Sequence, residues 1–215
     1  MNTLIISGGN IDCDFALDFM GKQKVDFIIA VDGGLSFTRK NKIQPDLIVG
    51  DFDSVPEKII EQYRREQQVP IREYNPEKDA TDTQIALEKA LEMKSDRIWI
   101  LGATGTRLDH VMGNIYILQQ AQRQGSQACL VDKHNRISLV SGERVLKKKE
   151  QYGKYVSFLP LGEKASGVNL EGFKYPLKNA VLSNDSSLGV SNEIAAEEAK
   201  VSLREGTLIM IESLD

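Results

Sequence analysis

The sequence predicts an α/β domain with a mostly parallel, Rossmann-like sheet, followed by an all-β sandwich or barrel. Up to about residue 134, short apolar runs alternate with helical patterns, and strands that alternate with helices form parallel sheets. From residue 135 onward the apolar runs are separated by turn signals, as in antiparallel sheets. We therefore expect two domains, residues 1–134 and residues 135–215.

The composition is that of an ordinary soluble globular protein, with 215 residues of which 41% are hydrophobic and 27% charged. A net charge of −4 leaves no basic excess to neutralise phosphates, so we expect no nucleic-acid partner. Residues 1–9 lack the basic start of a signal peptide and no apolar run reaches transmembrane length, so we expect no membrane partner. The two cysteines form no CxxC pair and no ligand cluster, which favours the reducing cytoplasm.

The expected elements of the first domain are short apolar strands and amphipathic helices. The strands are predicted at residues 4–6, 27–31, 47–49, 71–74, 98–101 and 128–131. Helices are predicted over residues 12–20, 57–66 and 81–94, and from residue 108 onward. In the last helix Leu108, Val111, Met112 and Ile115 have i, i+3, i+4, i+7 spacing, and we expect this stripe to face the core.

Two carboxylates, Asp51 and Asp53, follow the buried strand 47–49 and the turn at Gly50. Alternate side chains of an extended segment point the same way, so we expect the two aspartates to converge while Phe52 turns towards the core. A hard cation such as Mg²⁺ suits converging carboxylates, with water and phosphate oxygens as its other ligands. The alternative is that one aspartate caps the helix that begins near Pro56, but two carboxylates favour a metal site.

Glycine turns follow the first two strands as well. The turn at Gly8 and Gly9 lacks the third glycine of a dinucleotide fingerprint, so we interpret it as a close approach to a phosphate or base and exclude NAD. Asp32, Gly33 and Gly34 follow the second strand. Asp32 by itself is explained equally well as a helix cap or as part of a site.

The segment around Thr81 combines a helix start with charged residues. Thr81 and Gln84 have capping-box spacing, and Asp82 in the first turn complements the helix dipole. The sharper interpretation is that Lys78 reaches a phosphate and that Asp82 completes the metal ligands.

A further glycine loop, residues 102–106, leads into the helix that begins near residue 108. Unpaired N–H groups at a helix N-terminus bind anions, and Arg107 adds a planar cationic group. The loop lacks the G-K-[ST] of a Walker A motif. All of these turns are expected at the carboxyl ends of parallel strands, where ligands of such sheets bind.

The second domain is predicted from short strands and turns. The strands are expected at residues 137–140, 155–159, 168–170, 180–182, 200–203 and 208–211. Residues 193–200 are compatible with a helix, although a strand is favoured. This domain offers no nucleophile–base pair and no ligand cluster, so we expect it to bind and not to catalyse.

Five motifs together resemble the thiamine pyrophosphokinase family. They are Asp-Gly-Gly at 32–34, Gly-Asp-Phe-Asp-Ser at 50–54, Lys-Asp-x-Thr-Asp at 78–82, Gly-x-x-Gly-x-Arg-x-Asp-His at 102–110 and Leu-Gly-Val-Ser-Asn-Glu at 188–193. The resemblance covers essentially the whole chain. It implies an α/β nucleotide domain, an all-β thiamine-binding domain, a homodimer with active sites at the subunit interface, and transfer of pyrophosphate from ATP to the hydroxyl of thiamine with release of AMP.

The resemblance also implies roles for particular residues. Mg²⁺ and the phosphates would be surrounded by four carboxylates, which with Arg107 form the catalytic set: Asp51, Asp53, Asp82 and Asp109. The implied ATP-binding residues are Gly9, Asp32, Gly33, Lys78, Asp79, Thr81, Thr104, Gly105 and His110. The implied thiamine-binding residues are Gln84, Tyr175, Ser191 and Asn192. Animal members stack the thiamine ring on a Trp where this chain has Tyr175.

Two other functions remain open at this point. One is pyrophosphoryl transfer to another hydroxymethyl heterocycle, such as a pterin, because Tyr175, Ser191 and Asn192 do not name the ring. The other is a non-catalytic nucleotide sensor whose β domain binds a partner. The presence of all four expected carboxylates favours catalysis.

Overall fold

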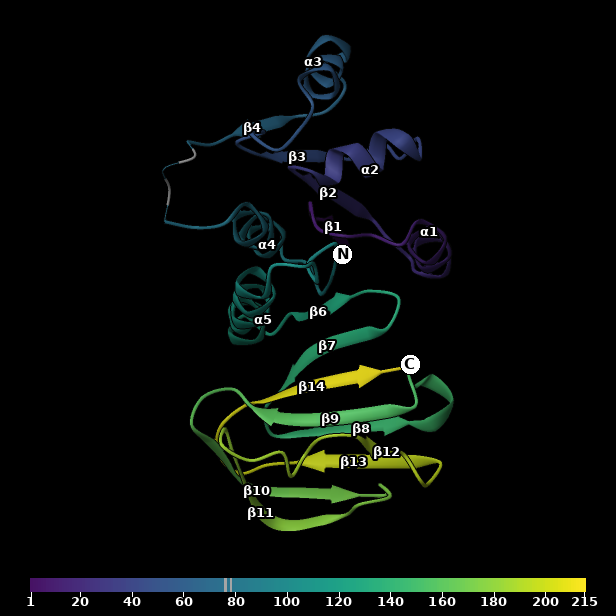
Figure 1. The fold of residues 1–215 in the computed structure, drawn as a ribbon, viewed down its shortest axis with the longest axis vertical. Helices are drawn as coiled ribbons and strands as arrows, with labels where there is room; N and C mark the ends of the chain where they lie inside the picture. The colour runs from purple at the N-terminus through teal and green to yellow at the C-terminus, as the bar shows by residue number, and fades with distance from the viewer. Residues whose placement is uncertain (76, 78) are drawn as a thin grey trace. The chain divides into compact units, whose positions relative to one another are not determined.

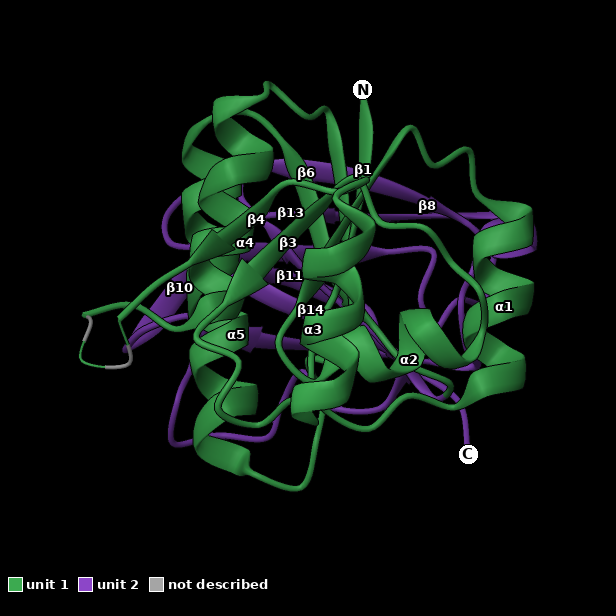
Figure 2. Cartoon of the chain, turned by 90° about the horizontal axis from the view of Figure 1, so that it is seen from above, with its two compact units in different colours: residues 1–133 green, residues 134–215 purple. Residues whose placement is uncertain are grey.

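The computed structural model describes residues 1–75, 77 and 79–215. The chain divides into two compact units, residues Met1–Lys133 and His134–Asp215 (Figures 1 and 2). No helix of the described residues is long and apolar enough to cross a membrane.

Unit 1 contains parallel strands in the order β4-β3-β2-β1-β5-β6. Their bounds are β1 (Asn2–Ile6), β2 (Phe27–Val31), β3 (Leu47–Gly50), β4 (Ile71–Glu73), β5 (Arg97–Leu101) and β6 (Gln127–Val131). Leu4 of β1 lies opposite Ile28 of β2 on one side and Trp99 of β5 on the other. The strand order reverses between β1 and β5, which makes their carboxyl ends the topological switch point where ligands of such sheets bind.

The helices of unit 1 cover both faces of this sheet. Their bounds are α1 (Cys13–Lys22), α2 (Gly34–Lys40), α3 (Glu57–Glu66), α4 (Asp82–Glu92) and α5 (Leu108–Arg123). In Figure 1, α4 and α5 lie on one side of the sheet and α1 and α2 on the other. α2 was indicated only through the helix-cap alternative for Asp32, and that alternative is wrong, because the N-cap is Gly33 and no described side chain caps the helix. The capping prediction for α4 is confirmed, because the Thr81 side chain accepts a hydrogen bond from the Gln84 amide.

The predicted core stripe of α5 is wrong in its first two turns. Leu108 is 75% exposed and Met112 43%, whereas Ile115 is buried. Sixteen residues of helix extend about 24 Å, whereas the five residues of β5 or β6 extend about 17 Å. The start of α5 therefore runs past the sheet, and the buried face is formed further along by Asn114, Ile115, Leu118 and Ala121.

Unit 2 is antiparallel. Its strands are β7 (Asn135–Val140), β8 (Glu143–Lys147), β9 (Tyr155–Pro160), β10 (Lys164–Glu171), β11 (Leu177–Ser183), β12 (Asn192–Glu193), β13 (Glu198–Ser202) and β14 (Leu208–Ser213). They pair in the orders β12-β9-β14-β7 and β11-β10-β13-β8. Residues of both sets, such as Phe158, Val168 and Val201, share one buried cluster. The ambiguous segment 193–200 forms no helix; Glu193 ends β12, residues 198–200 lie in β13, and residues 194–197 connect the two strands.

Candidate active site

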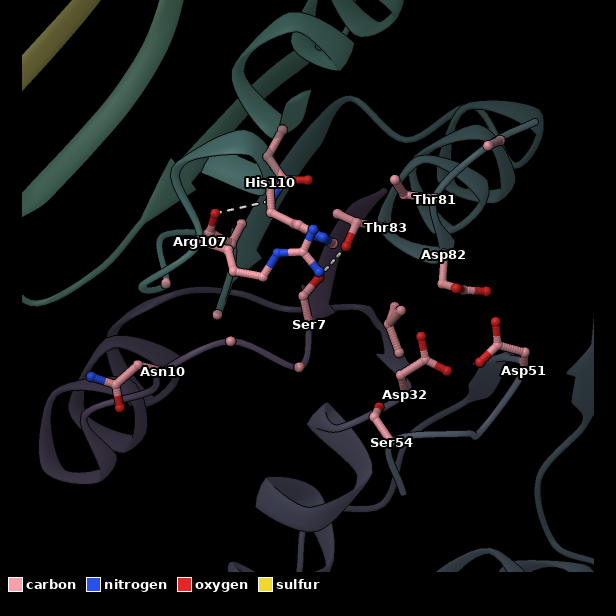
Figure 3. Close-up of a pocket in the computed structure, with 18 of the residues that line it drawn as sticks. Ser7, Asn10, Asp32, Asp51, Ser54, Thr81, Asp82, Thr83, Arg107 and His110 are labelled. Carbon is pink, nitrogen blue, oxygen red and sulfur yellow. Dashed lines mark hydrogen bonds between the residues drawn. The ribbon is translucent and has the colours of Figure 1, made fainter. Parts of the chain in front are cut away.

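A cavity of about 750 Å³ opens in unit 1 beside the switch point of the sheet (Figure 3). Loops after β1, β2, β3 and β5 line it, together with the starts of α4 and α5. Its polar lining includes Ser7, Asn10, Asp32, Asp51, Ser54, Asp79, Thr81, Asp82, Thr83, Arg107, His110 and Asn114. Most of the side chains predicted from the turns of the first domain are therefore brought together.

Three carboxylates meet at one side of the cavity. Asp32 follows β2, Asp51 follows β3 and Asp82 is the first residue of α4. Each offers an oxygen, and the three oxygens lie within 4.8 Å of one another. Figure 3 shows the three side chains pointing towards a common point. A set of carboxylate oxygens is the donor set that a hard divalent cation prefers.

The crowding has an electrostatic consequence for Asp32. Burial and the neighbouring charge of Asp82, with a smaller contribution from Asp51, raise the pKa of Asp32 from 3.8 to about 7. A hydrogen bond of 3.2 Å from the Phe52 amide to Asp32 Oδ1 opposes this shift. The cluster therefore retains a proton near neutral pH unless a cation offsets its charge.

The backbone after β3 departs from the expected extended conformation. Phe52 has a φ of +63°, in the left-handed region. Its side chain still turns into the core, where it is 8% exposed, but the turn leaves Asp53 exposed and outside the cluster of three. The expected Asp51/Asp53 convergence is thus replaced by convergence of Asp51 with Asp32 and Asp82.

The glycine turns allow backbone segments to approach closely at this edge. The Gly9 amide donates to the Gly102 carbonyl at 2.9 Å, and a Cβ on Gly9 would clash with that oxygen. A Cβ on Gly8 would likewise meet the backbone of Gly33. These contacts hold the turns after β1, β2 and β5 together: Gly8, Gly9 and Gly105 line the cavity, and Gly33, which packs against Gly8, is not among the lining residues.

At the start of α5, Arg107 and Asp109 form an exposed ion pair. Arg107 donates from Nε at 3.2 Å and from Nη2 at 2.5 Å to the two carboxylate oxygens. The hydrogen bond from Arg107 lowers the pKa of Asp109 to about 2. Arg107 and His110 line the cavity, whereas Asp109 does not and lies outside the carboxylate cluster. Asp109 is therefore placed to orient Arg107.

Of the remaining predicted residues of unit 1, some line the cavity and others do not. Asp79 and Thr81 line the cavity, and Lys78 lies outside the described residues. Gln84 donates from Nε2 to Glu88 at 2.9 Å, so its side chain runs along α4 and away from the lining set. Thr104 Oγ1 is buried and has no hydrogen-bond partner among the described residues.

The polar lining residues that were not predicted as site residues are Ser7, Asn10, Ser54, Thr83, Thr106 and Asn114. Asn114 is buried and donates from Nδ2 to the Ala103 carbonyl at 2.9 Å, which fixes the glycine loop 102–106 against α5. Ser7 and Thr83 join the end of β1 to the first turn of α4 through their hydroxyl groups at 3.0 Å. A polar residue among the buried positions of α5 was the one available signal for Asn114.

The predicted thiamine-binding residues of unit 2 lie close to one another. Tyr175 is 58% exposed and Asn192 only 4% exposed. Asn192 Oδ1 accepts from the Tyr175 amide at 3.0 Å, and Asn192 Nδ2 donates to the Tyr175 carbonyl at 2.8 Å. The neighbouring Ser191 is exposed, has a φ of +58° and donates its amide to Ser157 Oγ.

Comparison with known proteins gives a consistent result along the chain. Residues 21–130 match the thiamin pyrophosphokinase catalytic domain, and residues 143–208 match the thiamin pyrophosphokinase vitamin B1 binding domain. A thiamine pyrophosphokinase of Bacillus subtilis is 38% identical over 188 residues, which cover 87% of each chain.

Solved structures agree with these matches. The crystal structure of the Bacillus subtilis thiamine pyrophosphokinase superposes with a TM-score of 0.88 at 33% identity and covers 100% of both chains. The Geobacillus thermodenitrificans enzyme gives 0.87 at 32% identity, covering 100% of this chain and 98% of its own. The yeast enzyme shares the fold, with a TM-score of 0.83 at 19% identity over 99% of this chain and 86% of its own. The chain belongs to the thiamine pyrophosphokinase family.

Proposed function

We propose that the cavity of unit 1 binds ATP with a divalent metal, Mg²⁺, and that unit 2 binds thiamine. As a member of its family the chain is a thiamine diphosphokinase, which forms thiamine diphosphate from thiamine and ATP. The observation that carries the assignment of the site is the Asp32, Asp51 and Asp82 cluster at the carboxyl edge of the parallel sheet.

The cluster suits a metal on chemical grounds. All three donors are hard oxygens, and the raised pKa of Asp32 reflects burial and like charge that a cation would offset. Asp32, Asp51 and Asp82 would hold the ion. When bound, Mg²⁺ neutralises charge on the phosphate oxygens, which is its usual contribution to phosphoryl transfer.

The other residues of the cavity bind and orient the nucleotide. The close-packed turns at Gly9 and Gly105 let a phosphate approach the backbone, and the start of α5 offers N–H groups to an anion. Arg107, whose guanidinium donates two hydrogen bonds to Asp109, would place a planar cation beside the phosphates. Further polar contacts to ATP would come from Asp79, Thr81 and His110, which line the same cavity.

The reaction is a single transfer between oxygens. The thiamine hydroxyl oxygen forms a bond to the β-phosphorus of ATP, and the bond from that phosphorus to the oxygen that bridges to the α-phosphorus breaks. AMP leaves with that oxygen, and the hydroxyl proton passes to a nearby carboxylate. Catalysis of this kind rests on position and charge, and it needs no covalent intermediate with the protein.

Unit 2 would supply the thiamine contacts through the exposed ring of Tyr175 and through Ser191. An aromatic ring suits both the aminopyrimidine and the cationic thiazolium of thiamine. We also propose that the chain is a homodimer and that each active site combines unit 1 of one subunit with unit 2 of its partner. The support for the dimer is the family resemblance.

The assignment is tested by incubating the protein with ATP, Mg²⁺ and thiamine while AMP and ADP are separated by chromatography. We expect thiamine-dependent AMP without ADP. Asp51→Asn and Asp82→Asn should each abolish most of this activity, because the amide keeps the shape and loses the charge. Asp14→Asn is the matched control, since Asp14 is exposed in the first turn of α1 and lies outside the cavity.

The alternatives give different results in the same assay. A hydroxymethyl pterin that replaces thiamine with equal or higher efficiency would identify the other heterocycle as the substrate. Nucleotide binding without AMP formation would indicate a sensor. Steady formation of ADP would contradict pyrophosphoryl transfer.

A further inference from the structure

The side-chain amide of Asn192 forms its hydrogen bonds with the backbone around it. Its Oδ1 accepts from the Tyr175 amide at 3.0 Å and from the Glu193 amide at 2.9 Å. Its Nδ2 donates to the Tyr175 carbonyl at 2.8 Å. With 4% of its surface exposed, the amide has little surface left for a ligand.

The amide continues a strand pairing that the backbone itself does not complete. Phe173 forms an antiparallel bridge with Ile194, and the Lys174 amide donates to the Glu193 carbonyl at 2.9 Å. At the next position the Asn192 side chain takes the place of a backbone partner and binds both the N–H and the C=O of Tyr175. The peptide groups on both sides of the Tyr175 Cα are therefore fixed.

The fixed residue carries an exposed ring. Tyr175 is 58% exposed, although its backbone is held on both sides. Ordering a side chain in a complex costs free energy, and a ring whose backbone is already fixed loses less freedom on binding. The hydrogen bonds of Asn192 thus prepare Tyr175 for contact with a flat ligand.

We propose that Asn192 is a positioning residue for thiamine binding: it holds the backbone of Tyr175 so that the ring meets thiamine, and it does not contact thiamine itself. The inference rests on the proposed function, in which Tyr175 contacts the thiamine ring. It differs from the expectation that Asn192 meets the aminopyrimidine directly.

A double-mutant cycle separates the two roles. Tyr175→Ala and Asn192→Ala should each raise the KM for thiamine about tenfold, which is the effect of losing the contact of one well-ordered side chain. Both variants should leave the KM for ATP within about twofold. In the Tyr175→Ala background, Asn192→Ala should raise the thiamine KM by less than about twofold, because its effect passes through the missing ring. Asn192→Asp, which keeps the acceptor and loses the donor, should fall between wild type and Asn192→Ala and provides a second variant for the cycle.

Asn169 offers a matched control in the same unit. Its Oδ1 accepts from the Asn179 amide at 2.8 Å and its Nδ2 donates to the Gly167 carbonyl at 3.1 Å. Asn169→Ala removes a comparable pair of backbone contacts, so it should lower the melting temperature and leave the thiamine KM unchanged. Amide exchange at Tyr175 should quicken at least about tenfold in Asn192→Ala and stay unchanged in Asn169→Ala.

The outcomes are distinct. Additive effects of Asn192→Ala and Tyr175→Ala on the thiamine KM would show that Asn192 contacts thiamine and would overturn the inference. No effect of Tyr175→Ala would also overturn it, while thiamine-dependent AMP formation by the wild type would leave the proposed function intact. If the wild type itself formed no AMP in the presence of thiamine, that result would instead contradict the proposed function.

Discussion

The carboxylate of Asp32 occupies the space into which a side chain on Gly50 would project. A Cβ built on Gly50 would collide with Asp32 Oδ1, and the Phe52 ring lies close on another side. Gly50 ends β3, and Asp32 follows the neighbouring β2. The bare Cα of Gly50 therefore allows the carboxylates of two adjacent strand ends to meet.

Gly50→Ala should displace the Asp32 carboxylate and weaken metal binding. The added methyl has no room unless Asp32 moves, and Asp32 is one of the three proposed ligands. We expect the Mg²⁺ concentration for half-maximal AMP formation to rise at least about tenfold, as for loss of an interaction of about 1.4 kcal/mol.

Gly21→Ala is the control, because Gly21 lies in α1 and a methyl group added there would meet no atom within 4 Å. It should leave the Mg²⁺ dependence unchanged and add about 0.5–1 kcal/mol to the free energy of unfolding. Unchanged Mg²⁺ dependence in Gly50→Ala would remove Asp32 from the metal site.

The raised pKa of Asp32 predicts how the stability of the metal-free protein depends on pH. Below pH 3.8 the carboxyl is protonated in both the folded and the unfolded chain. Between 3.8 and about 7 the unfolded chain loses this proton while the folded chain keeps it, so folding stability falls as the pH rises through this window. Above about pH 7 the contribution is constant.

Asp32→Asn removes this contribution and should stabilise the metal-free protein more at about pH 7.5 than at about pH 5. The measurement is the melting temperature of wild type and variant in a chelator at both pH values, with Asp14→Asn as the control. Addition of Mg²⁺ at the higher pH should stabilise the wild type and have less effect on Asp32→Asn. A difference in melting temperature that is equal at the two pH values would contradict the raised pKa.

The ion pair of Arg107 with Asp109 predicts that Asp109 contributes through the arginine. Asp109→Asn should raise the KM for ATP several-fold, because it releases the Arg107 guanidinium. It should leave the Mg²⁺ requirement within about twofold, because Asp109 is not one of the three clustered carboxylates. Asp82→Asn should instead raise the Mg²⁺ requirement. An equal rise in both variants would place Asp109 among the metal ligands.

Much of the fold could be predicted because buried parallel strands are continuous apolar runs. Residues 47–49 and 98–101 are such runs, and both lie in strands of the sheet. β8 could not be found in this way, because exposed and partly buried residues alternate along it, and β12 has only two residues. The bounds of α2 were not predicted, because the helix begins within the glycine turn.

The sequence predicted where the candidate site lies, but only in part which side chains meet there. Glycine turns with carboxylates marked the edge of the sheet, but only the pairing of β2 with β3 shows that Asp32 joins Asp51. The left-handed conformation of Phe52 could not be expected, because bulky residues rarely adopt it. That one dihedral angle removes Asp53 from the cluster.

The corrected face of α5 is tested by stability. Ile115→Ala should lower the free energy of unfolding by about 2–5 kcal/mol, because it opens a cavity in the core. Leu108→Ala should change it by less than about 0.5 kcal/mol, since Leu108 is 75% exposed. Chemical denaturation of both variants measures the difference, and equal losses would restore the stripe that the spacing predicted.

The final prediction concerns the proposed dimer. The carboxylate cluster belongs to unit 1, and Tyr175 and Ser191 belong to unit 2. If each active site combines unit 1 of one subunit with unit 2 of its partner, a mixed dimer of Asp51→Ala and Ser191→Ala chains has one site with both changes and one with neither. Each variant alone should be poorly active, and the mixed dimer should recover about half of the wild-type activity per dimer, because one of its two sites is intact.

The experiment dissociates the two variants together, reassembles them and confirms heterodimers by mass. A mixture of Asp51→Ala with Asp82→Ala is the matched control, since both changes fall in unit 1 and every site of its mixed dimers keeps one lesion. Recovery in the first mixture and none in the second would support a shared site. If each site were built within a single chain, every site in either mixture would keep one lesion, and confirmed heterodimers without recovery would place the whole site in one subunit.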